Sequence, residues 1–170
     1  APRIVCFFGM LPNFTPSAVL PKLATLLRPD DLLLVSANLA PGPDYAAGVE
    51  RVLPLYDNPL TREWLWTVLQ DLGADGGDGR MEFRIGPCPE GSGLLRIEAV
   101  VVFGRTCRLR FDGEVFEYAG GTEFRLFFSY RHTPARLRAQ CAERGIVLPA
   151  HWENGSGNEG VFLGTLDPRR

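Results

Sequence analysis

The sequence has few histidines, cysteines and lysines. Of its 18 basic residues only Lys22 is a lysine, and the chain has 2 histidines and 4 cysteines. The cysteines, at positions 6, 88, 107 and 141, include no C-x-x-C pair, and His132 and His151 lie far apart, so we expect no metal site. A formal net charge of −2 gives no electrostatic reason to expect nucleic-acid binding.

Long apolar runs and a disulfide pattern are also missing. No stretch approaches the roughly 20 apolar residues that span a bilayer, so the sequence predicts no membrane-spanning helix. A chain of 170 residues can bury a core of its own, so its cysteines are interpreted as reduced residues of a cytoplasmic protein. With 45% hydrophobic and 22% charged residues, the composition is that of a globular domain.

The first forty residues predict a βαβ unit. The uninterrupted apolar run from Ile4 to Phe8, between Arg3 and Gly9, indicates a buried strand, and Thr15 with Pro16 is typical of a helix start. A second apolar strand is expected from Leu32 to Leu39, parallel to the first. Because a buried strand needs neighbours on both sides, a strand at residue 3 predicts that this chain is a piece of a longer one.

The rest of the chain predicts an insertion and then a return to the core. A helix is expected over 61–72, after which the apolar period changes to two and indicates an antiparallel meander over 81–118, with a hairpin at 111–114. The expected elements that follow are a strand over 124–130, a helix over 135–144, and strands over 146–148 and 160–163. One domain interrupted by an insertion fits this order better than two tandem domains.

Two motifs suggest chemistry that their context disfavours. The run from Gly155 to Gly160 has the form G-x-G-x-x-G, but a strand follows it where a phosphate-binding loop needs a helix, so a hairpin turn is expected. Ser129 and His132 suggest a hydrolase, but neighbours at a strand-to-helix junction rarely point together. That class of enzyme stays open only if the two side chains lie within hydrogen-bond distance.

The strongest local signal lies at the carboxyl end of the first strand. Ligands in open α/β sheets bind there, and the glycine in Phe7-Phe8-Gly9-Met10-Leu11-Pro12-Asn13-Phe14 permits close approach of the backbone. The side chain of Asn13 can both donate and accept hydrogen bonds. In the alternative interpretation it only satisfies the local backbone.

These residues resemble the second half of a class I S-adenosylmethionine-dependent methyltransferase. More narrowly, they are similar to the histidine-specific methyltransferase family of ergothioneine biosynthesis, whose order of elements matches nearly the whole chain. The motifs that carry the resemblance are Gly9-Met-Leu-Pro-Asn13-Phe14, Leu27-Arg-Pro-Asp-Asp-Leu-Leu-Leu, Leu55-Tyr56-Asp57-Asn58 and Trp152-Glu153-Asn154 before Phe162-Leu163.

The resemblance implies roles for individual residues. Substrate-binding positions of the family fall on Asn13, Tyr56 and Ser129, and Phe8 and Gly9 form the rim that touches the cofactor, S-adenosylmethionine. Its main binding loop is expected N-terminal to this chain. Phe127 stands where the family has a glutamate that hydrogen-bonds an imidazole, which implies a substrate with a more apolar far end than histidine.

The sequence thus predicts an α/β fold, a partial Rossmann-like methyltransferase sheet with an inserted antiparallel α+β subdomain. Residues 1–54 and 131–170 are expected to form the core, and 55–130 the subdomain for substrate recognition. The expected activity is transfer of a methyl group to a small molecule such as an amino-acid-like amine, as part of a longer chain, with no catalytic residue assigned. The alternative is a non-catalytic truncated domain that mediates dimerisation, because an exposed sheet edge could pair with a second copy.

Overall fold

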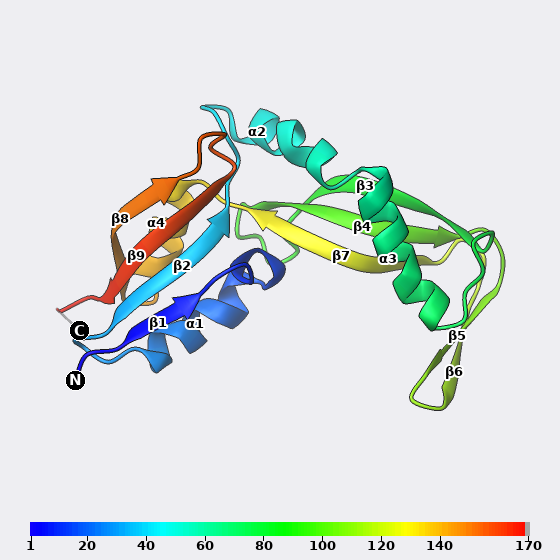
Figure 1. The fold of residues 1–170 in the computed structure, drawn as a ribbon, viewed down its shortest axis with the longest axis horizontal. Coiled ribbons are helices and arrows are strands. Elements are labelled where there is room, and N and C mark those ends of the chain that lie inside the picture. Colours follow the sequence, from blue (N-terminus) through cyan, green and yellow to red (C-terminus); the bar gives the residue numbers. More distant parts are fainter. Residues whose placement is uncertain (169–170) are drawn as a thin grey trace. The chain divides into compact units, whose positions relative to one another are not determined.

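The computed structural model describes residues 1–168 of the 170, which divide into two compact units (Figure 1). The first unit comprises Ala1–Val52, Gly86–Arg96 and Ser129–Arg170, and the second comprises Leu53–Ile85 and Ile97–Phe128. The segment 86–96, which the sequence assigned to the insertion, therefore groups with the first unit. The role of the insertion in substrate recognition stays a prediction.

A four-stranded mixed sheet forms the centre of the first unit. Its strands are β1 (Ile4–Phe7), β2 (Leu32–Asn38), β8 (Ile146–Glu153) and β9 (Glu159–Leu166), in the order β1-β2-β9-β8. Strand β1 runs parallel to β2, whereas β9 is antiparallel to both β2 and β8. The predictions of a mixed α/β fold, and of one sheet shared by the first two and the last two strands, are confirmed.

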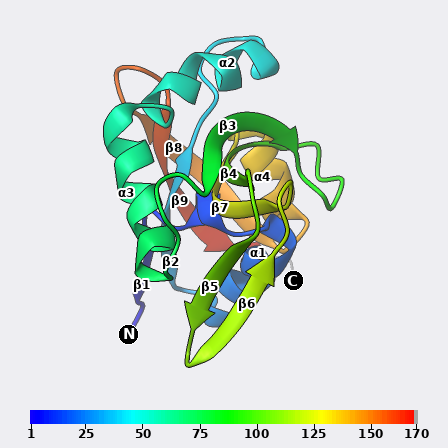
Figure 2. The ribbon, with the colours of Figure 1, turned by 90° about the vertical axis from the view of Figure 1, so that its right-hand side faces the viewer.

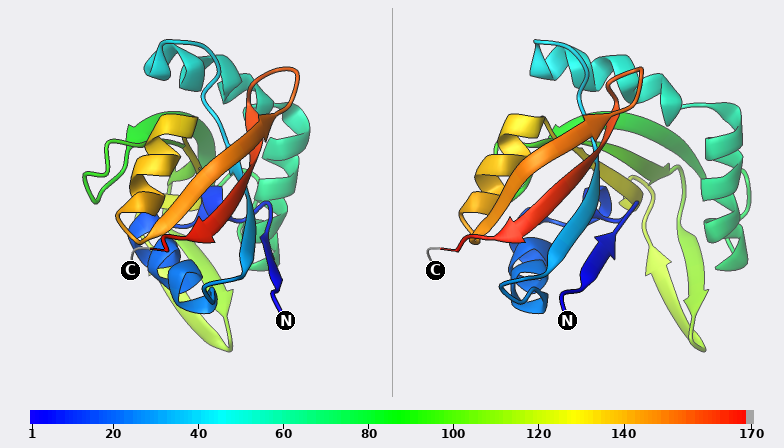
Figure 3. Two further views of the ribbon diagram at one scale, coloured as in Figure 1. Left: turned by 90° about the vertical axis from the view of Figure 1, so that its left-hand side faces the viewer. Right: turned by 60° about the vertical axis from the view of Figure 1, so that its left-hand side comes forward.

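Two helices cover one face of this sheet. They are α1 (Pro16–Leu26) and α4 (Pro134–Ala142), each with a proline in its first turn, as predicted (Figure 3). The Thr133 side chain caps α4 by accepting a hydrogen bond from the Arg136 N–H at 3.2 Å. The core between helices and sheet includes Leu20, Leu33 and Phe162. Full burial of one such side chain contributes about 1.5–3 kcal/mol.

The opposite face of the sheet, here called the open face, carries exposed apolar side chains. Cross-strand pairing places Cys6 beside Leu34 and Leu34 beside Leu163. The same face carries Ile4, Leu32, Val161 and Trp152. The expectation of a fully buried first strand is wrong: Ile4 is 64% exposed, because β1 is an edge strand and α1 and α4 both pack on the other face.

Hydrogen bonds connect the loop between α1 and β2 to Arg3, just before β1. Asp31, which is buried, accepts hydrogen bonds from the Arg3 N–H at 2.9 Å, the Arg3 side chain and the Arg28 N–H. The guanidinium of Arg3 lowers the pKa of the Asp31 carboxyl well below its usual range. The remaining helical elements of this unit are η1 (Leu11–Asn13) and α2 (Tyr45–Val52).

The second unit packs α3 (Pro59–Asp71) on strands. The predicted meander is split between two sheets, one in the order β3 (Gly79–Pro87), β4 (Leu95–Phe103), β7 (Glu123–Arg131), and one of β5 (Cys107–Phe111) and β6 (Glu114–Tyr118). The short helix η2 (Leu53–Leu55) precedes α3. Asp112 and Gly113, with φ of 51° and 80°, turn the predicted hairpin between β5 and β6 (Figure 2).

The apolar side chains of α3 are only partly buried. Leu65 and Leu69 are buried, but Trp64 is 62% and Val68 is 43% exposed. The helix packs instead around Leu69, with Trp66 and Leu72 beside it. The helix therefore buries some of its apolar side chains and leaves others exposed.

Three further findings concern residues 1–168. Cys88, Cys107 and Cys141 are buried, whereas Cys6 is exposed on β1. No described helix is long and apolar enough to cross a membrane. No group of three or more His, Cys, Asp or Glu side chains in the same residues is placed to hold a metal ion.

Candidate functional site

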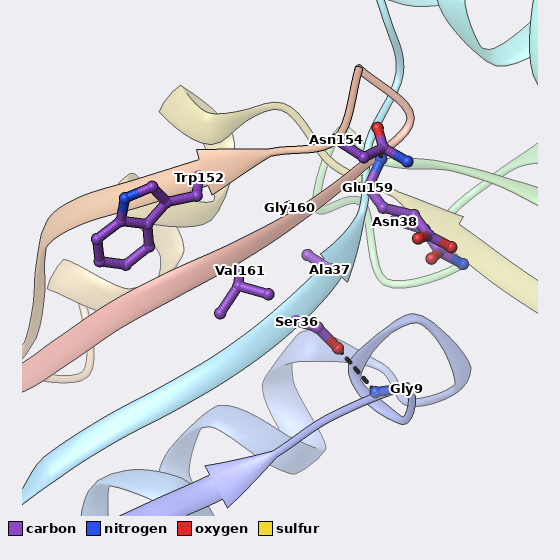
Figure 4. Close-up of a pocket in the computed structure, with 9 residues that line it drawn as sticks. All are labelled: Gly9, Ser36, Ala37, Asn38, Trp152, Asn154, Glu159, Gly160 and Val161. Atoms are coloured by element: carbon purple, nitrogen blue, oxygen red, sulfur yellow. Dashed lines mark hydrogen bonds between the residues drawn. The ribbon is translucent and has the colours of Figure 1, made fainter. Parts of the chain in front are cut away.

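A cavity of about 300 Å³ lies on the open face, at the carboxyl ends of β1 and β2 (Figure 4). The β1–β2 side contributes Gly9, Ser36, Ala37 and Asn38, and the β8–β9 side contributes Trp152, Asn154, Glu159, Gly160 and Val161. All nine residues belong to the first unit. The cavity thus occupies the end of the sheet where the sequence predicted a ligand.

Gly9 forms one wall of this cavity without filling it. Its φ is +71°, in the region that favours glycine, and its N–H donates to Ser36 Oγ at 2.7 Å. A Cβ added at Gly9 would meet no atom within 4 Å. The glycine is therefore required by the backbone turn, and the space beside it is open to a ligand.

Asn38 forms hydrogen bonds with residues at and just after the end of β7. Its side-chain amide donates to Ser129 Oγ at 3.0 Å, and its carbonyl accepts from the His132 N–H at 2.9 Å. Ser129 is buried, with 1% of its surface exposed. Because a hydrogen bond to a buried hydroxyl restrains a half-buried amide, this contact helps to orient Asn38 at the cavity wall.

The predicted site residues fall into two groups. Gly9 lines the cavity, and Ser129 reaches it through Asn38. Asn13 is an exposed residue at the end of η1 whose N–H donates to Met10 O at 2.9 Å, and it is not among the lining residues. Phe8, beside Gly9, is 50% exposed. The ligand-binding roles of these residues stay predictions.

Tyr56 belongs to the second unit. It is half-buried, and its ring centroid lies 5.6 Å from that of Phe127. Phe127 therefore contacts the tyrosine that the resemblance assigned to substrate binding. The two rings form a tilted aromatic pair within the second unit.

Ser129 and His132 do not form a catalytic pair. Both ring nitrogens of His132 lack a hydrogen-bond partner among residues 1–168, and the ring is completely buried. Burial, with the nearby charge of Arg131, lowers the pKa of His132 to about 4. A neutral imidazole without contact to the serine cannot activate it, so the hydrolase alternative has no support from the geometry.

The run from Gly155 to Gly160 is the turn of the β8–β9 hairpin, as predicted. Asn154 Oδ1 accepts from the Asn158 N–H at 3.1 Å and from Ser156 Oγ at 3.2 Å. The loop satisfies its polar groups internally and leads into β9, not into a helix. The nucleotide-binding interpretation is therefore excluded for this loop.

Of the nine lining residues, only Gly9 was predicted as a site residue. The polar and aromatic lining residues that were not predicted are Ser36, Asn38, Trp152, Asn154 and Glu159. Ser36 and Asn38 occupy alternate positions at the end of an otherwise apolar strand, a pattern that marks one face of the strand as polar at that end. Glu159 lies next to the glycine-rich turn, where the sequence indicated only a hairpin. Its proximity to Asn38 depends on the pairing of β9 with β2, which no local pattern shows.

Comparison with known proteins gives distant structural likenesses. No protein-family model and no curated protein sequence matches the chain. A S-adenosylmethionine-dependent methyltransferase from Clostridium acetobutylicum is 6% identical with a TM-score of 0.43, over 96% of this chain and 57% of that one. The CcbJ methyltransferase from Streptomyces caelestis is 10% identical with a TM-score of 0.42, over 97% and 56%.

A third solved structure is the glycopeptide N-methyltransferase MtfA in complex with S-adenosyl-L-methionine. It is 8% identical with a TM-score of 0.37, and the match covers 97% of this chain and 57% of that one. The chain therefore spans a little over half the length of each of these three proteins. The activity of this chain is therefore argued from its own residues.

Proposed function

We propose that this chain is part of a class I S-adenosylmethionine-dependent methyltransferase that acts on a small amine. The observation that supports this most is the open cavity beside Gly9, at the carboxyl ends of the parallel strands β1 and β2. The motif from Gly9 to Phe14, which resembles the methyltransferase family, lies at this end of the sheet. We further propose that the protein belongs to the histidine-specific methyltransferase family.

The cavity suits part of a small ligand. Its volume, about 300 Å³, is at the lower end of the ~300–1,000 Å³ usual for ligand pockets. The exposed rim residues Phe8 and Gly9 would contact S-adenosylmethionine, which supplies an electrophilic methyl group when bound. The remaining contacts to the cofactor are proposed to come from sequence N-terminal to this chain.

The chain's own residues would position the acceptor. Methyl transfer depends mainly on holding donor and acceptor in line, and no metal or strong base is required for a neutral amine. Asn38, fixed by Ser129, would line the acceptor side of the cavity. Asn13 and Tyr56 are proposed to add substrate contacts, with Phe127 favouring an acceptor that carries an apolar group.

The test is binding of S-adenosylmethionine to the full-length natural protein that carries this sequence, measured by calorimetry. We expect saturable binding that Phe8→Ala weakens about tenfold, equivalent to a loss of about 1.4 kcal/mol. Met10→Ala is the matched control, since Met10 is 49% and Phe8 50% exposed. Absence of binding, or equal effects of the two variants, would contradict the proposal.

A non-catalytic interaction domain is the second candidate, and one observation favours it. The open face exposes Ile4 by 64%, Leu32 by 37% and Trp152 by 59%. Contiguous exposed apolar side chains of this kind mark surfaces that bind other proteins. The two candidates differ in whether the full-length protein binds the methyl donor.

A further inference from the structure

We infer that the cavity beside Gly9 binds the ammonium end of an arylalkylamine, with Glu159 as the residue that selects the positive charge. A role of this amine as methyl acceptor rests on the proposed function and would require the ammonium to lose a proton to water first, because only the neutral amine has a lone pair for the methyl group. Binding of the ammonium does not rest on that function. The inference names a ligand class and a specificity-determining residue that the sequence analysis did not find.

Glu159 brings the only charge to the cavity. Of the nine lining residues, it alone has an ionisable acidic or basic side chain. It is the first residue of β9 and pairs directly with Asn38 at the end of β2 (Figure 4). A glutamate at this position makes the cavity negative at neutral pH, so anionic ligands are disfavoured.

The carboxylate of Glu159 is free to accept a ligand. Among residues 1–168 it makes no ion pair and no side-chain hydrogen bond, and the side chain is exposed. Its neighbour Glu153, by contrast, is engaged with His151 at 3.0 Å. The nearby Arg131 donates hydrogen bonds from Nη1 to the carbonyl oxygens of Leu39 and Asn158, at 3.1 Å each. A charge-assisted hydrogen bond from an ammonium would give Glu159 the partner that the chain does not supply.

Apolar side chains line the same cavity as this charge. Trp152 and Val161 are directly opposite each other on β8 and β9, and both line the cavity. Trp152 is 59% exposed, so its indole is available to a ligand. Val161 and Glu159 are two residues apart on β9, which places them roughly 6.6 Å apart along the strand. In the inferred complex, the aromatic ring packs on the apolar side chains and a short alkyl chain carries the ammonium towards Glu159.

The experiment titrates the full-length protein, without S-adenosylmethionine, with three probes that differ in charge. The probes are 2-phenylethylamine, the neutral 2-phenylethanol and the anionic 3-phenylpropionate. Binding is followed by the NMR signals of the Trp152 indole N–H and the Gly160 amide. We expect the amine to bind at least tenfold more tightly than either of the other probes, and to shift both signals.

Two variants separate a specific role of Glu159 from a general effect of charge. Glu159→Gln keeps the size of an exposed side chain and is expected to weaken binding of the amine at least tenfold. Glu50→Gln removes the same charge from an exposed position on α2 that does not line the cavity, and should leave the affinity unchanged. Trp152→Ala is expected to weaken the amine and the alcohol to the same degree, because it removes the apolar contact.

Several outcomes would overturn the inference. These are no saturable binding of 2-phenylethylamine, equal affinity for the three probes, or equal effects of Glu159→Gln and Glu50→Gln. Its failure is distinct from failure of the proposed function. Binding of S-adenosylmethionine without the amine would remove only the inference, and binding of the amine without S-adenosylmethionine would remove only the methyltransferase proposal.

Discussion

The side-chain amide of Asn38 donates a hydrogen bond to Ser129 Oγ at 3.0 Å, although 91 positions separate the two residues in the sequence. The contact joins the end of β2 to the end of β7, where the chain returns from the insertion. The resemblance assigned Ser129 to direct contact with substrate. Ser129 is buried, with 1% exposed, and its contact with Asn38 helps to position a residue that lines the cavity, while its direct contact with substrate stays a prediction.

The first prediction is that Ser129→Ala destabilises the protein by about 1–3 kcal/mol, because the Asn38 amide loses its buried acceptor. Chemical denaturation measures this change. Ser156→Ala is the control: Ser156 Oγ also donates within a local network, but in an exposed loop. A double-mutant cycle with Asn38→Ala should give a coupling energy of about 1 kcal/mol. A coupling of zero would mean that the contact has no role in holding Asn38.

The second prediction concerns the turn at Gly9. Gly9→Ala should cost about 1–2 kcal/mol of stability, since φ is +71° and an L-residue is strained there. Gly155→Ala is a suitable control because both glycines have open space where a Cβ would lie, but Gly155 does not have a positive φ. Equal unfolding midpoints for the two variants would contradict a strain requirement at Gly9.

The strand order and the cavity differ in how far the sequence could predict them. Apolar runs and the proline and threonine at helix starts placed β1, α1, β2 and α4 correctly, because these signals are local. The open face was missed, because a run such as Ile4 to Phe7 looks the same in a central strand and in an edge strand. Which it is depends on neighbours distant in the sequence.

The residues that line the cavity could also be predicted only in part. Gly9 could be found because glycine at a strand end has a local meaning. Glu159 could not, because its place beside Asn38 arises from the antiparallel pairing of β9 with β2. Tyr56 was assigned by resemblance alone, and its ring lies 5.6 Å from that of Phe127 in the second unit.

The third prediction is an acid-dependent loss of stability due to His132. Its pKa in the folded protein is about 4, below the 6.5 of an ordinary histidine, so between these values the unfolded chain binds the proton more readily. Stability therefore falls as the pH falls from 6.5 to 4, by at most about 1.4 kcal/mol per pH unit from this residue.

His132→Leu should remove this part of the pH dependence. Denaturation at several pH values measures it, and the difference between wild type and variant should be constant from pH 7 to 8, where histidine is neutral in both states. A variant as pH-dependent as the wild type between pH 6.5 and 4 would show that His132 does not contribute.

The fourth prediction concerns self-association through β1 and the open face. We expect the chain to form dimers, and Ile4→Lys to weaken them, because a charge on an edge strand opposes pairing. Leu60→Lys is the control, since Leu60 is 77% and Ile4 is 64% exposed but Leu60 lies on α3. Sedimentation velocity over a range of concentrations measures this, and a monomer at every concentration would contradict the prediction.

The central claim is that the end of the sheet at Gly9 is part of a methyl-donor site. The most direct measurement is an NMR titration of the full-length natural protein, labelled with ¹⁵N, with S-adenosylhomocysteine, the product form of the donor. The account predicts saturable shifts of the Gly9 and Ser36 amides, both at the cavity wall. Saturable binding that leaves these amides unmoved, or no binding at all, would contradict it.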